Sequence, residues 1–407
     1  MQHGIIGRIG VGHDRGEPSR RARIAAIATA LGVAGVVGGC SGETKGTSGA
    51  GSSNASTAAG GALGAQCAVG VRDVLVSTGA GSGPAVAFGG DHYLVAWTST
   101  VKDAGDIRIA LLDAKGAKVT EQPLAEGPSV ASFPSIVAEA DGFLVVWQEL
   151  AASGATVYGR RVDPMGMPKG AAFSIATSGS VDARPSVAEA SMGAAVAWAD
   201  STSSTLALIN GQMLTNKTPI DQGAGPAIGG AGAALGITWV AGSKLGASMM
   251  TSPGAPLVPI MFREAVGKAN APRVAVHDDG TLSVVWEDNR AGDGHEAIYR
   301  VRIDKSAQAG KETTISTGID SANYPDVAWT GTHDAVVYYQ FRGGPPAIYL
   351  SLIAPDGTTA DQDLKISADG VAARLPRIVR TGDTAGTFGV VYAEKDGPIR
   401  ASLVTCP

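Results

Sequence analysis

The sequence contains few cysteines, few aromatic residues and few charged residues. Of its 407 residues, three are cysteine, 5% are aromatic and 17% are charged, whereas 57 are glycine. Scarce aromatics together with abundant glycine favour many tight turns over long helices. The formal net charge of −5 supplies no basic surplus to neutralise phosphates, so we expect no nucleic-acid partner. Hydrophobic residues make up 44% of the chain, which is enough for a substantial core.

Sequence signatures of catalytic and metal sites are also missing. The chain has no HExxH motif, no paired-cysteine spacing and, in the region expected to fold, no GxSxG nucleophile motif. The glycine-rich stretches GAGSG and GAGPAIGG open no helix, which argues against phosphate binding of the P-loop or dinucleotide kind. Asp288, Asn289 and Asp293 lack the spacing and the bidentate glutamate of a calcium loop. We therefore predict neither a metal nor a cofactor.

The first forty residues resemble the export signal of a bacterial lipoprotein. Arginines at positions 15, 20, 21 and 23 precede the apolar run IAAIATALGVAGVVGG, which is too short for a transmembrane helix. The ending VGGC is similar to a lipobox and implies lipidation of Cys40; the alternative is an ordinary secretory signal with a chance cysteine. The stretch SRRARIA partly resembles a twin-arginine signal, but Arg23 replaces the usual aromatic residue, so the export route stays open.

We expect residues 1–39 to be the signal peptide and residues 40–66 to be the lipidated cysteine and a tether. Residues 41–66 are almost all Gly, Ser, Thr and Ala, a composition that cannot bury enough apolar surface to become ordered. Signal cleavage removes five arginines and two acids, a net +3, so the mature chain carries −5 − 3 = −8. By resemblance to Gram-negative lipoproteins, Ser41 after the lipid site favours the outer membrane of the cell envelope. The side of that membrane is left open.

Residues 67–407 contain seven copies of one pattern. Each copy has a proline, an apolar β run, a polar turn and a second β run that ends in an aromatic residue, as in PSIVAEADGFLVVW. The leading prolines are Pro84, Pro134, Pro185, Pro226, Pro272, Pro325 and Pro376. The closing aromatics, which we expect in the core between repeats, are Trp97, Trp147, Trp198, Trp239, Trp286, Tyr338 and Tyr392.

Most copies continue with a third strand such as AIYRVRID, and several with a fourth such as AFSIATSG. Four strands in a unit of about 45–50 residues are typical of a β-propeller blade. Residues 67–407 therefore resemble bacterial seven-bladed β-propeller proteins, an all-β fold, with no functional subfamily indicated. The copies between residues 185 and 262 are the most degraded, so six or eight blades remain alternatives.

The two ends of the repeat region complement each other. The seventh copy stops after its third strand, PIRASLVT, whereas the stretch RDVLVSTG before the first copy resembles the fourth strands. An N-terminal strand that completes the last blade would close the ring without exposed edges. Cys67 and Cys406 flank this closure, and we predict a disulfide between them, worth on the order of 4–5 kcal/mol at most. The alternative is two unrelated thiols.

A candidate binding site follows from the residue after each leading proline, which is expected near the central channel. The first four copies have Ala85, Ser135, Ser186 and Ala227 there, but the last three have Arg273, Asp326 and Arg377. Neighbouring loops add Arg184, Arg374, Asp288, Arg290 and Arg342. Converging arginines suit a carboxylate, a phosphate or an acidic sugar. The alternative is that Arg273, Asp326 and Arg377 form a structural salt-bridge ladder between blades.

Three histidine–aspartate pairs fall at the expected turns between first and second strands. They are Asp91–His92, His277–Asp278 and His333–Asp334. Such pairs occur in metal and acid–base sites, but these turns are expected at the face opposite the arginines. Aspartate also suits tight turns for backbone reasons. We interpret the pairs as turn residues.

These features predict a lipid-anchored envelope propeller that works as a binding or scaffolding module for a glycan, a peptide or another envelope protein. One alternative is an enzyme, a hydrolase or lyase acting on an acidic polysaccharide. In that case Arg273 and Arg377 would hold the acidic group, and Asp326 would act as acid or base. The repeats lack the SxDxGxTW boxes of sialidases. A second alternative is a purely structural envelope protein.

Overall fold

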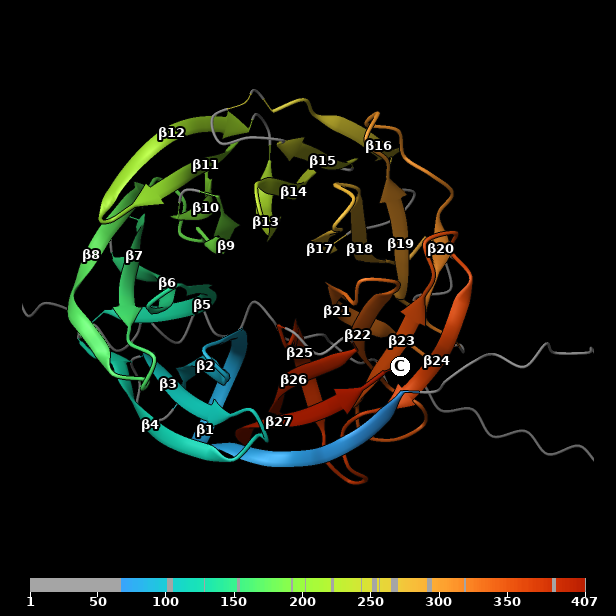
Figure 1. The fold of residues 1–407 in the computed structure, drawn as a ribbon, viewed down its shortest axis with the longest axis horizontal. Helices are drawn as coiled ribbons and strands as arrows, with labels where there is room; N and C mark the ends of the chain where they lie inside the picture. The colour runs from blue at the N-terminus through green and yellow to red at the C-terminus, as the bar shows by residue number, and fades with distance from the viewer. Residues whose placement is uncertain are drawn as a thin grey trace, which may run out of the picture. The chain divides into compact units, whose positions relative to one another are not determined.

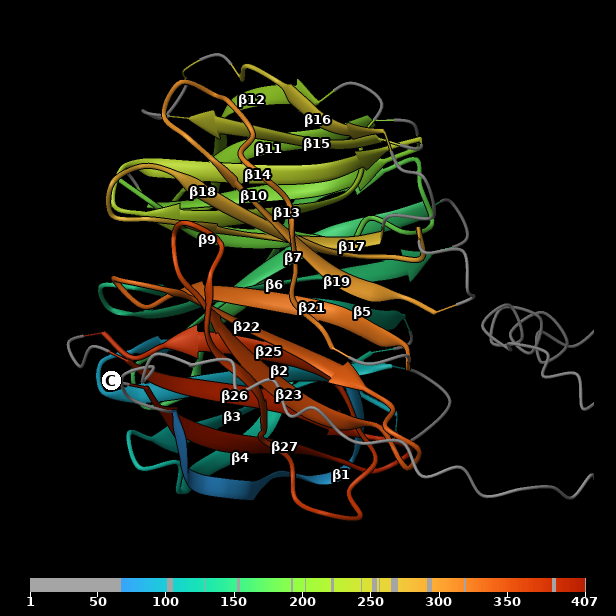
Figure 2. The ribbon, with the colours of Figure 1, turned by 90° about the vertical axis from the view of Figure 1, so that its right-hand side faces the viewer.

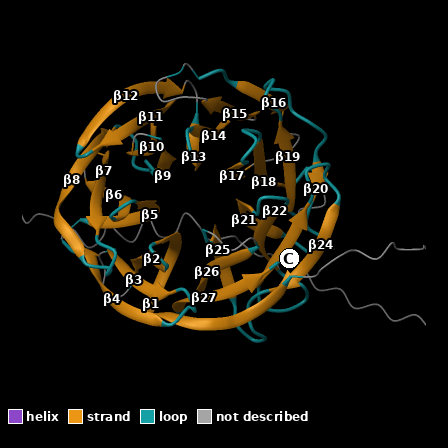
Figure 3. Cartoon of the chain, viewed as in Figure 1, coloured by secondary structure: helices purple, strands orange, loops and turns teal. Residues whose placement is uncertain are grey.

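The computed structural model describes residues 67–406, apart from short internal gaps. The gaps are residues 101–104, 128, 152–153, 192, 202, 221–222, 243, 251–254, 256, 265–269, 291–294, 318–319 and 383–385. The predicted signal peptide, Cys40, the predicted tether and Asp293 fall outside the described residues. Within the described part, the chain forms strands and loops and no helix (Figure 3). Accordingly, no helix there is long and apolar enough to cross a membrane.

The strands form antiparallel sheets, five of them four-stranded. These five sheets contain, in chain order, β5 (Val130–Glu139), β6 (Gly142–Ala151), β7 (Gly154–Val162) and β8 (Pro168–Ser178); β9 (Ser186–Ala190), β10 (Gly193–Asp200), β11 (Ser203–Asn210) and β12 (Met213–Ile220); β13 (Ala224–Ala231), β14 (Ala234–Ala241), β15 (Lys244–Met250) and β16 (Ile260–Glu264); β17 (Asn270–Val276), β18 (Leu282–Asp288), β19 (Ala297–Ile303) and β20 (Thr313–Thr314); and β21 (Ala322–Trp329), β22 (Asp334–Gln340), β23 (Ala347–Ile353) and β24 (Thr359–Lys365).

The sixth sheet joins the two ends of the propeller. It contains β1 (Ala68–Gly89), β2 (His92–Ser99), β3 (Asp106–Asp113), β4 (Lys118–Ala125), β25 (Ala373–Arg380), β26 (Thr387–Glu394) and β27 (Pro398–Thr405). β1 pairs with β27 over Ala68–Ala80 and with β2 over Gly81–Gly89. If β1 is divided where its partner changes, the described strands form seven four-stranded units. The count of seven blades rests on this division and stays a prediction.

The units are arranged as a closed ring (Figures 1 and 2). The first strands β5, β9, β13, β17, β21 and β25 lie around the centre, and each contacts the first strand of the next unit; β25 contacts β1. All seven closing aromatics are at most 4% exposed, and each lies in a hydrophobic cluster made by two neighbouring units. Their assignment to the core is therefore confirmed. The degraded region near 185–262 folds as two sheets, β9–β12 and β13–β16.

The predicted closure is confirmed, and the contacts of two tyrosines show why the N-terminal strand fits. In the unit β21–β24, the Tyr338 hydroxyl donates to Asp363 on the fourth strand, and the Asp363 N–H donates to Ser351 Oγ at 3.1 Å. In the last unit, Tyr392 donates to Asp73 of β1, and the Asp73 N–H donates to Ser402 Oγ at 3.1 Å. Asp73 thus takes the place of a fourth-strand aspartate.

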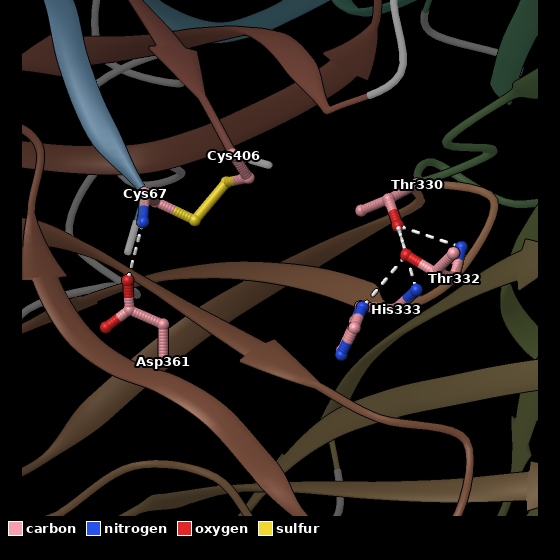
Figure 4. Close-up of a disulfide and its surroundings, with 6 residues drawn as sticks. All are labelled: Cys67, Thr330, Thr332, His333, Asp361 and Cys406. Carbon is pink, nitrogen blue, oxygen red and sulfur yellow. Dashed lines mark hydrogen bonds between the residues drawn. A yellow bond between two sulfur atoms is a disulfide. The ribbon is translucent and has the colours of Figure 1, made fainter. Parts of the chain in front are cut away.

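The predicted disulfide is also confirmed: the Cys67 and Cys406 sulfurs are bonded, with 4.1 Å between the Cα atoms (Figure 4). Both cysteines are at most 5% exposed. The Cys67 N–H donates to Asp361 Oδ2 of β24 at 2.9 Å, which ties the start of β1 to the preceding unit as well. The closure is therefore held by strand pairing, by side-chain hydrogen bonds and by one covalent bond.

Each leading proline is preceded by a residue in the left-handed region, with φ between 33° and 55°. These residues are Gly83, Phe133, Arg184, Gly225, Ala271, Tyr324 and Leu375. In the first strands of six units, the pairing register shifts at this point. Such a bulge re-aims the side chains next to it. It sets the direction of the residue after each proline, where the candidate site was predicted.

Candidate functional site

Arg273, Asp326 and Arg377 lie on the neighbouring central strands β17, β21 and β25, each directly after its leading proline (Figure 1). Arg273 Nε lies 3.9 Å from Asp326 Oδ1, a long ion pair. Arg273 and Arg377 each donate one hydrogen bond from Nη1 to the carbonyl of the proline before them, at 2.9 and 3.0 Å. In the part of the chain that the structure describes, no carboxylate lies within 4 Å of the Arg377 guanidinium. We call these three residues with Arg184 and Glu287 the axial cluster.

The other four members of the axial cluster all act on the charge of Arg273. Burial, together with the positive charges of Arg377 and Arg184, lowers the pKa of Arg273 to about 9, whereas Asp326 and Glu287 oppose the shift. Arg273 remains charged at neutral pH. The shift means that the folded protein disfavours this positive charge, and that a bound anion would relieve the repulsion.

Asp326 also has a structural function at the seam between two units. Its Oδ2 accepts the N–H of Ile378 on β25 at 3.0 Å. Ser135 accepts the N–H of Val187 and Ser186 accepts that of Ile228 in the same manner, both at 3.1 Å. In these three units, the residue after the leading proline ties its strand to the next unit. The contact between Asp326 and Ile378 joins two units, as the predicted ladder would. Arg273 and Arg377 still form no short ion pair with described residues.

Arg184 lies two residues before the start of β9, with a left-handed backbone. Its Nε donates to Asp182 Oδ1 at 2.8 Å, and its guanidinium lies 4.9 Å from the centre of the Phe133 ring. The Arg184 side chain is 54% exposed, the most accessible of the predicted arginines with a described ion pair. Arg184 belongs to the axial cluster because its charge acts on Arg273.

Arg290 and Arg342 engage their own units instead of the axial cluster. Arg290 lies 3.8 Å from the centre of the Tyr299 ring and pairs with Asp288 at 2.8 Å and with Glu312. Arg342 repeats this arrangement in the next unit, 4.0 Å from the centre of the Tyr349 ring and paired with Asp363 at 2.9 Å. Both arginines fold back over the third strand toward the fourth. Arg374 on β25 instead reaches the preceding unit, where it lies 5.8 Å from the centre of the Phe341 ring.

Sequence reasoning missed Glu287, which follows the closing Trp286. Its side chain points into the seam between β17 and β21: Oε2 accepts the Tyr324 N–H at 2.7 Å, and Oε1 accepts the Asn270 side-chain amide at 3.1 Å. Glu287 is 6% exposed, and burial, with the nearby charge of Glu296, raises the pKa of its carboxyl above the ordinary value of 4.5. A polar residue directly after a closing tryptophan is the sequence signal that could have identified it.

Two members of different histidine–aspartate pairs, His277 and Asp334, contact each other. His277 Nε2 lies 2.9 Å from Asp334 Oδ1, a contact between two units, and Thr281 Oγ1 lies 3.0 Å from His277 Nδ1. Asp334 also accepts from Ser283 and Arg300, and all of these side chains are buried.

His333 does serve its turn, because its N–H donates to Thr330 Oγ1 at 2.8 Å (Figure 4). Across the described residues, no cluster of three or more His, Cys, Asp or Glu side chains could hold a metal ion.

Comparisons with known proteins show the fold. No protein family and no curated protein matches the sequence. The α-L-arabinofuranosidase of Fusarium graminearum is 13% identical, with a TM-score of 0.52, over 82% of this chain and 97% of that one. An α-L-arabinanase of Penicillium chrysogenum is 11% identical, with a TM-score of 0.50, over the same shares. The NanB sialidase of Streptococcus pneumoniae is 11% identical, with a TM-score of 0.45, over 83% and 70%. At 11–13% identity, the likeness to the arabinofuranosidase and the arabinanase shows a β-propeller-like fold and no more.

Proposed function

We propose that the axial cluster binds a carboxylate-bearing ligand, an acidic glycan or an acidic peptide of the cell envelope. The protein would then be a binding module held to the outer membrane through lipid on Cys40. The observation that carries this proposal is the state of two guanidinium groups. Arg273 and Arg377 each donate one hydrogen bond to a proline carbonyl, and in the described residues no short ion pair occupies their remaining donors.

The charge of the axial cluster supports an anionic ligand. The charges of Arg184, Arg377, Asp326 and Glu287 all act on Arg273, and burial favours the neutral form of Glu287. The cluster therefore carries positive charge in a protein whose formal net charge is −5. A guanidinium binds a carboxylate through two parallel hydrogen bonds, which gives direction as well as attraction. Arg273 and Arg377 stand on either side of β21, where such a ligand would be shared.

Replacing Arg377 with glutamine is expected to weaken binding of a trigalacturonate by about tenfold or more. Hydrogen bonds to charged groups contribute about 1.5–3 kcal/mol, and about 1.4 kcal/mol corresponds to tenfold in affinity. Titration calorimetry on the full mature chain would measure this, with neutral galactotriose as the comparison ligand. Arg302→Gln is the control, since Arg302 pairs with Asp279 in the turn after β17, at the other end of that strand from the leading proline.

Equal binding of the acidic and neutral trisaccharides would contradict the proposal. Unchanged affinity of the Arg377→Gln protein would also contradict it. A fall in melting temperature without any loss of affinity would show that Arg377 serves the ladder between units.

An enzyme that cleaves an acidic polysaccharide is the second candidate. Glu287 favours it, because a buried carboxyl with a raised pKa can act as a general acid, and Asp326 lies on the adjacent central strand. Solved propellers of similar fold include an arabinanase and an arabinofuranosidase, which supports this candidate weakly at 11–13% identity. Mass spectrometry of the trigalacturonate after incubation separates the candidates. Unchanged ligand mass fits a binding module, and shorter products fit a hydrolase or lyase.

A further inference from the structure

Glu287 lies close enough to Arg273 for its protonation to respond to a charged ligand at the axial cluster. It stands two residues beyond Val285, which pairs with Arg273 across the β17–β18 hairpin. Its Oε2 accepts the N–H of Tyr324, the bulge residue of the next unit. Arg273 is among the charges that act on the Glu287 carboxyl, and Glu287 among those that act on Arg273. An anion held by Arg273 would therefore repel a carboxylate at position 287.

The structure contains a neutral counterpart of Glu287. Gln148 follows the closing Trp147 of its unit, and its Oε1 accepts the N–H of Ala183 at 2.8 Å and of Arg184 at 3.0 Å. Arg184 is the left-handed residue before the leading proline of that next unit, as Tyr324 is here. An amide oxygen thus bridges two units as well as a carboxylate does. The negative charge of Glu287 is therefore not required for the hydrogen bond between units, and Glu287 can be protonated without loss of this bond.

The groups that face Glu287 come from every strand packed around it. β17 contributes Asn270 and Arg273, the segment before β19 contributes the carboxylate Glu296, and β21 contributes the Tyr324 N–H. Beyond these, the Tyr339 phenol of β22 couples to the same carboxyl and to Arg374. Burial and Glu296 disfavour the ionised form, whereas the two hydrogen bonds and Arg273 favour it.

We infer that anion binding at Arg273 and Arg377 is coupled to proton uptake by Glu287, so that the site binds its ligand more tightly as the pH falls. The inference rests on the proposed function, because it concerns the same site. The proton comes from solvent and adds to a carboxylate oxygen of Glu287, and no other bond forms or breaks. Protonation removes the negative charge that competes with the ligand. By linkage, the factor by which a bound anion strengthens proton binding equals the factor by which the proton strengthens anion binding.

The test is a calorimetric titration of the full mature chain with trigalacturonate at several values between about pH 5 and pH 7.5, where the sugar carboxylates stay ionised. We expect the affinity of the wild type to rise about fivefold or more toward pH 5. Repeating the titration in buffers of different ionisation enthalpy should show net proton uptake. The Glu287→Gln protein, which copies the Gln148 arrangement, should bind with the high affinity at every pH and take up no proton.

Glu139→Gln is the control, because Glu139 pairs with Arg161 on β7 and lies at the end of β5, far along the strand from the proline. It should keep the pH dependence of the wild type. If Glu287→Gln also keeps that dependence, the titrating group lies elsewhere and the inference is wrong while the binding site stands. If the wild type binds with no pH dependence, the inference is likewise wrong. If no binding occurs at any pH, the proposed function fails and the inference fails with it.

Discussion

Replacing both Cys67 and Cys406 with serine is expected to lower the free energy of unfolding by several kcal/mol, on the order of 5 kcal/mol at the upper limit. The disulfide joins residues 339 apart in the sequence, so in the unfolded chain it closes almost the whole propeller into one loop. Removing the bond returns that conformational entropy to the unfolded state. Guanidinium unfolding followed by tryptophan fluorescence would show the midpoint shift to lower denaturant.

The variant is expected to fold nonetheless, because β1 keeps its other contacts. Ala368 donates its N–H to Asp73 Oδ2 at 2.7 Å, and Arg72 donates to the Ser367 carbonyl at 3.2 Å. Hydrogen exchange should accelerate first at the β1–β27 pair, the seam that the disulfide closes. A reducing agent should shift the wild type to the midpoint of the variant and leave the variant unchanged. Equal midpoints for the oxidised wild type and the variant would show that the bond contributes nothing.

Local pattern was sufficient to predict most of the fold. Three features repeat along the chain: the leading prolines, the alternation before each closing aromatic and the DG turns. Each four-stranded unit could therefore be predicted separately. The closure could be read as well, since RDVLVSTG resembles the fourth strands and the two cysteines flank it. The left-handed residue before each leading proline could not be predicted, because five of these seven residues are not glycine. Phe133, Arg184 and Tyr324 carry no local signal for a left-handed backbone.

The candidate site was predicted in part, and the failures share a cause. Arg273, Asp326 and Arg377 occupy equivalent repeat positions, so the symmetry of the ring was sufficient to bring them to adjacent strands. Arg290 sits in a loop, and its direction is set by the Tyr299 ring and by Glu312, which no repeat position predicts. The Glu287 carboxylate is held in place by the Tyr324 N–H of the next unit. Contacts between units of different sequence lie beyond what one repeat can show.

Truncating Asp334 to alanine is expected to destabilise the protein by about 3–5 kcal/mol, because a charge would be left buried without its partner. Asp334 is fully buried and accepts from His277, Ser283 and Arg300, which joins β18 and β19 to β22 across one interface. Although burial alone would raise it, the His277 hydrogen bond and the Arg300 charge hold the pKa of Asp334 below its ordinary value of 3.8. The stability contributed by this ionisation is therefore present above pH about 4 and is lost as the pH falls through the lowered pKa.

Thermal and denaturant unfolding of Asp334→Ala near neutral pH would measure the loss, with Asp278→Ala as the control. Asp278 is exposed in the neighbouring turn and accepts from Trp329 at 3.1 Å, so its removal should cost about 1 kcal/mol or less. The double replacement Arg300→Met with Asp334→Leu removes both charges together and should recover most of the lost stability, since well-packed apolar residues can replace a buried ion pair. If Asp334→Ala were as stable as Asp278→Ala, the network would not hold these units together. If the double variant were no better than Asp334→Ala, packing or the remaining polar groups would matter more than the unpaired arginine.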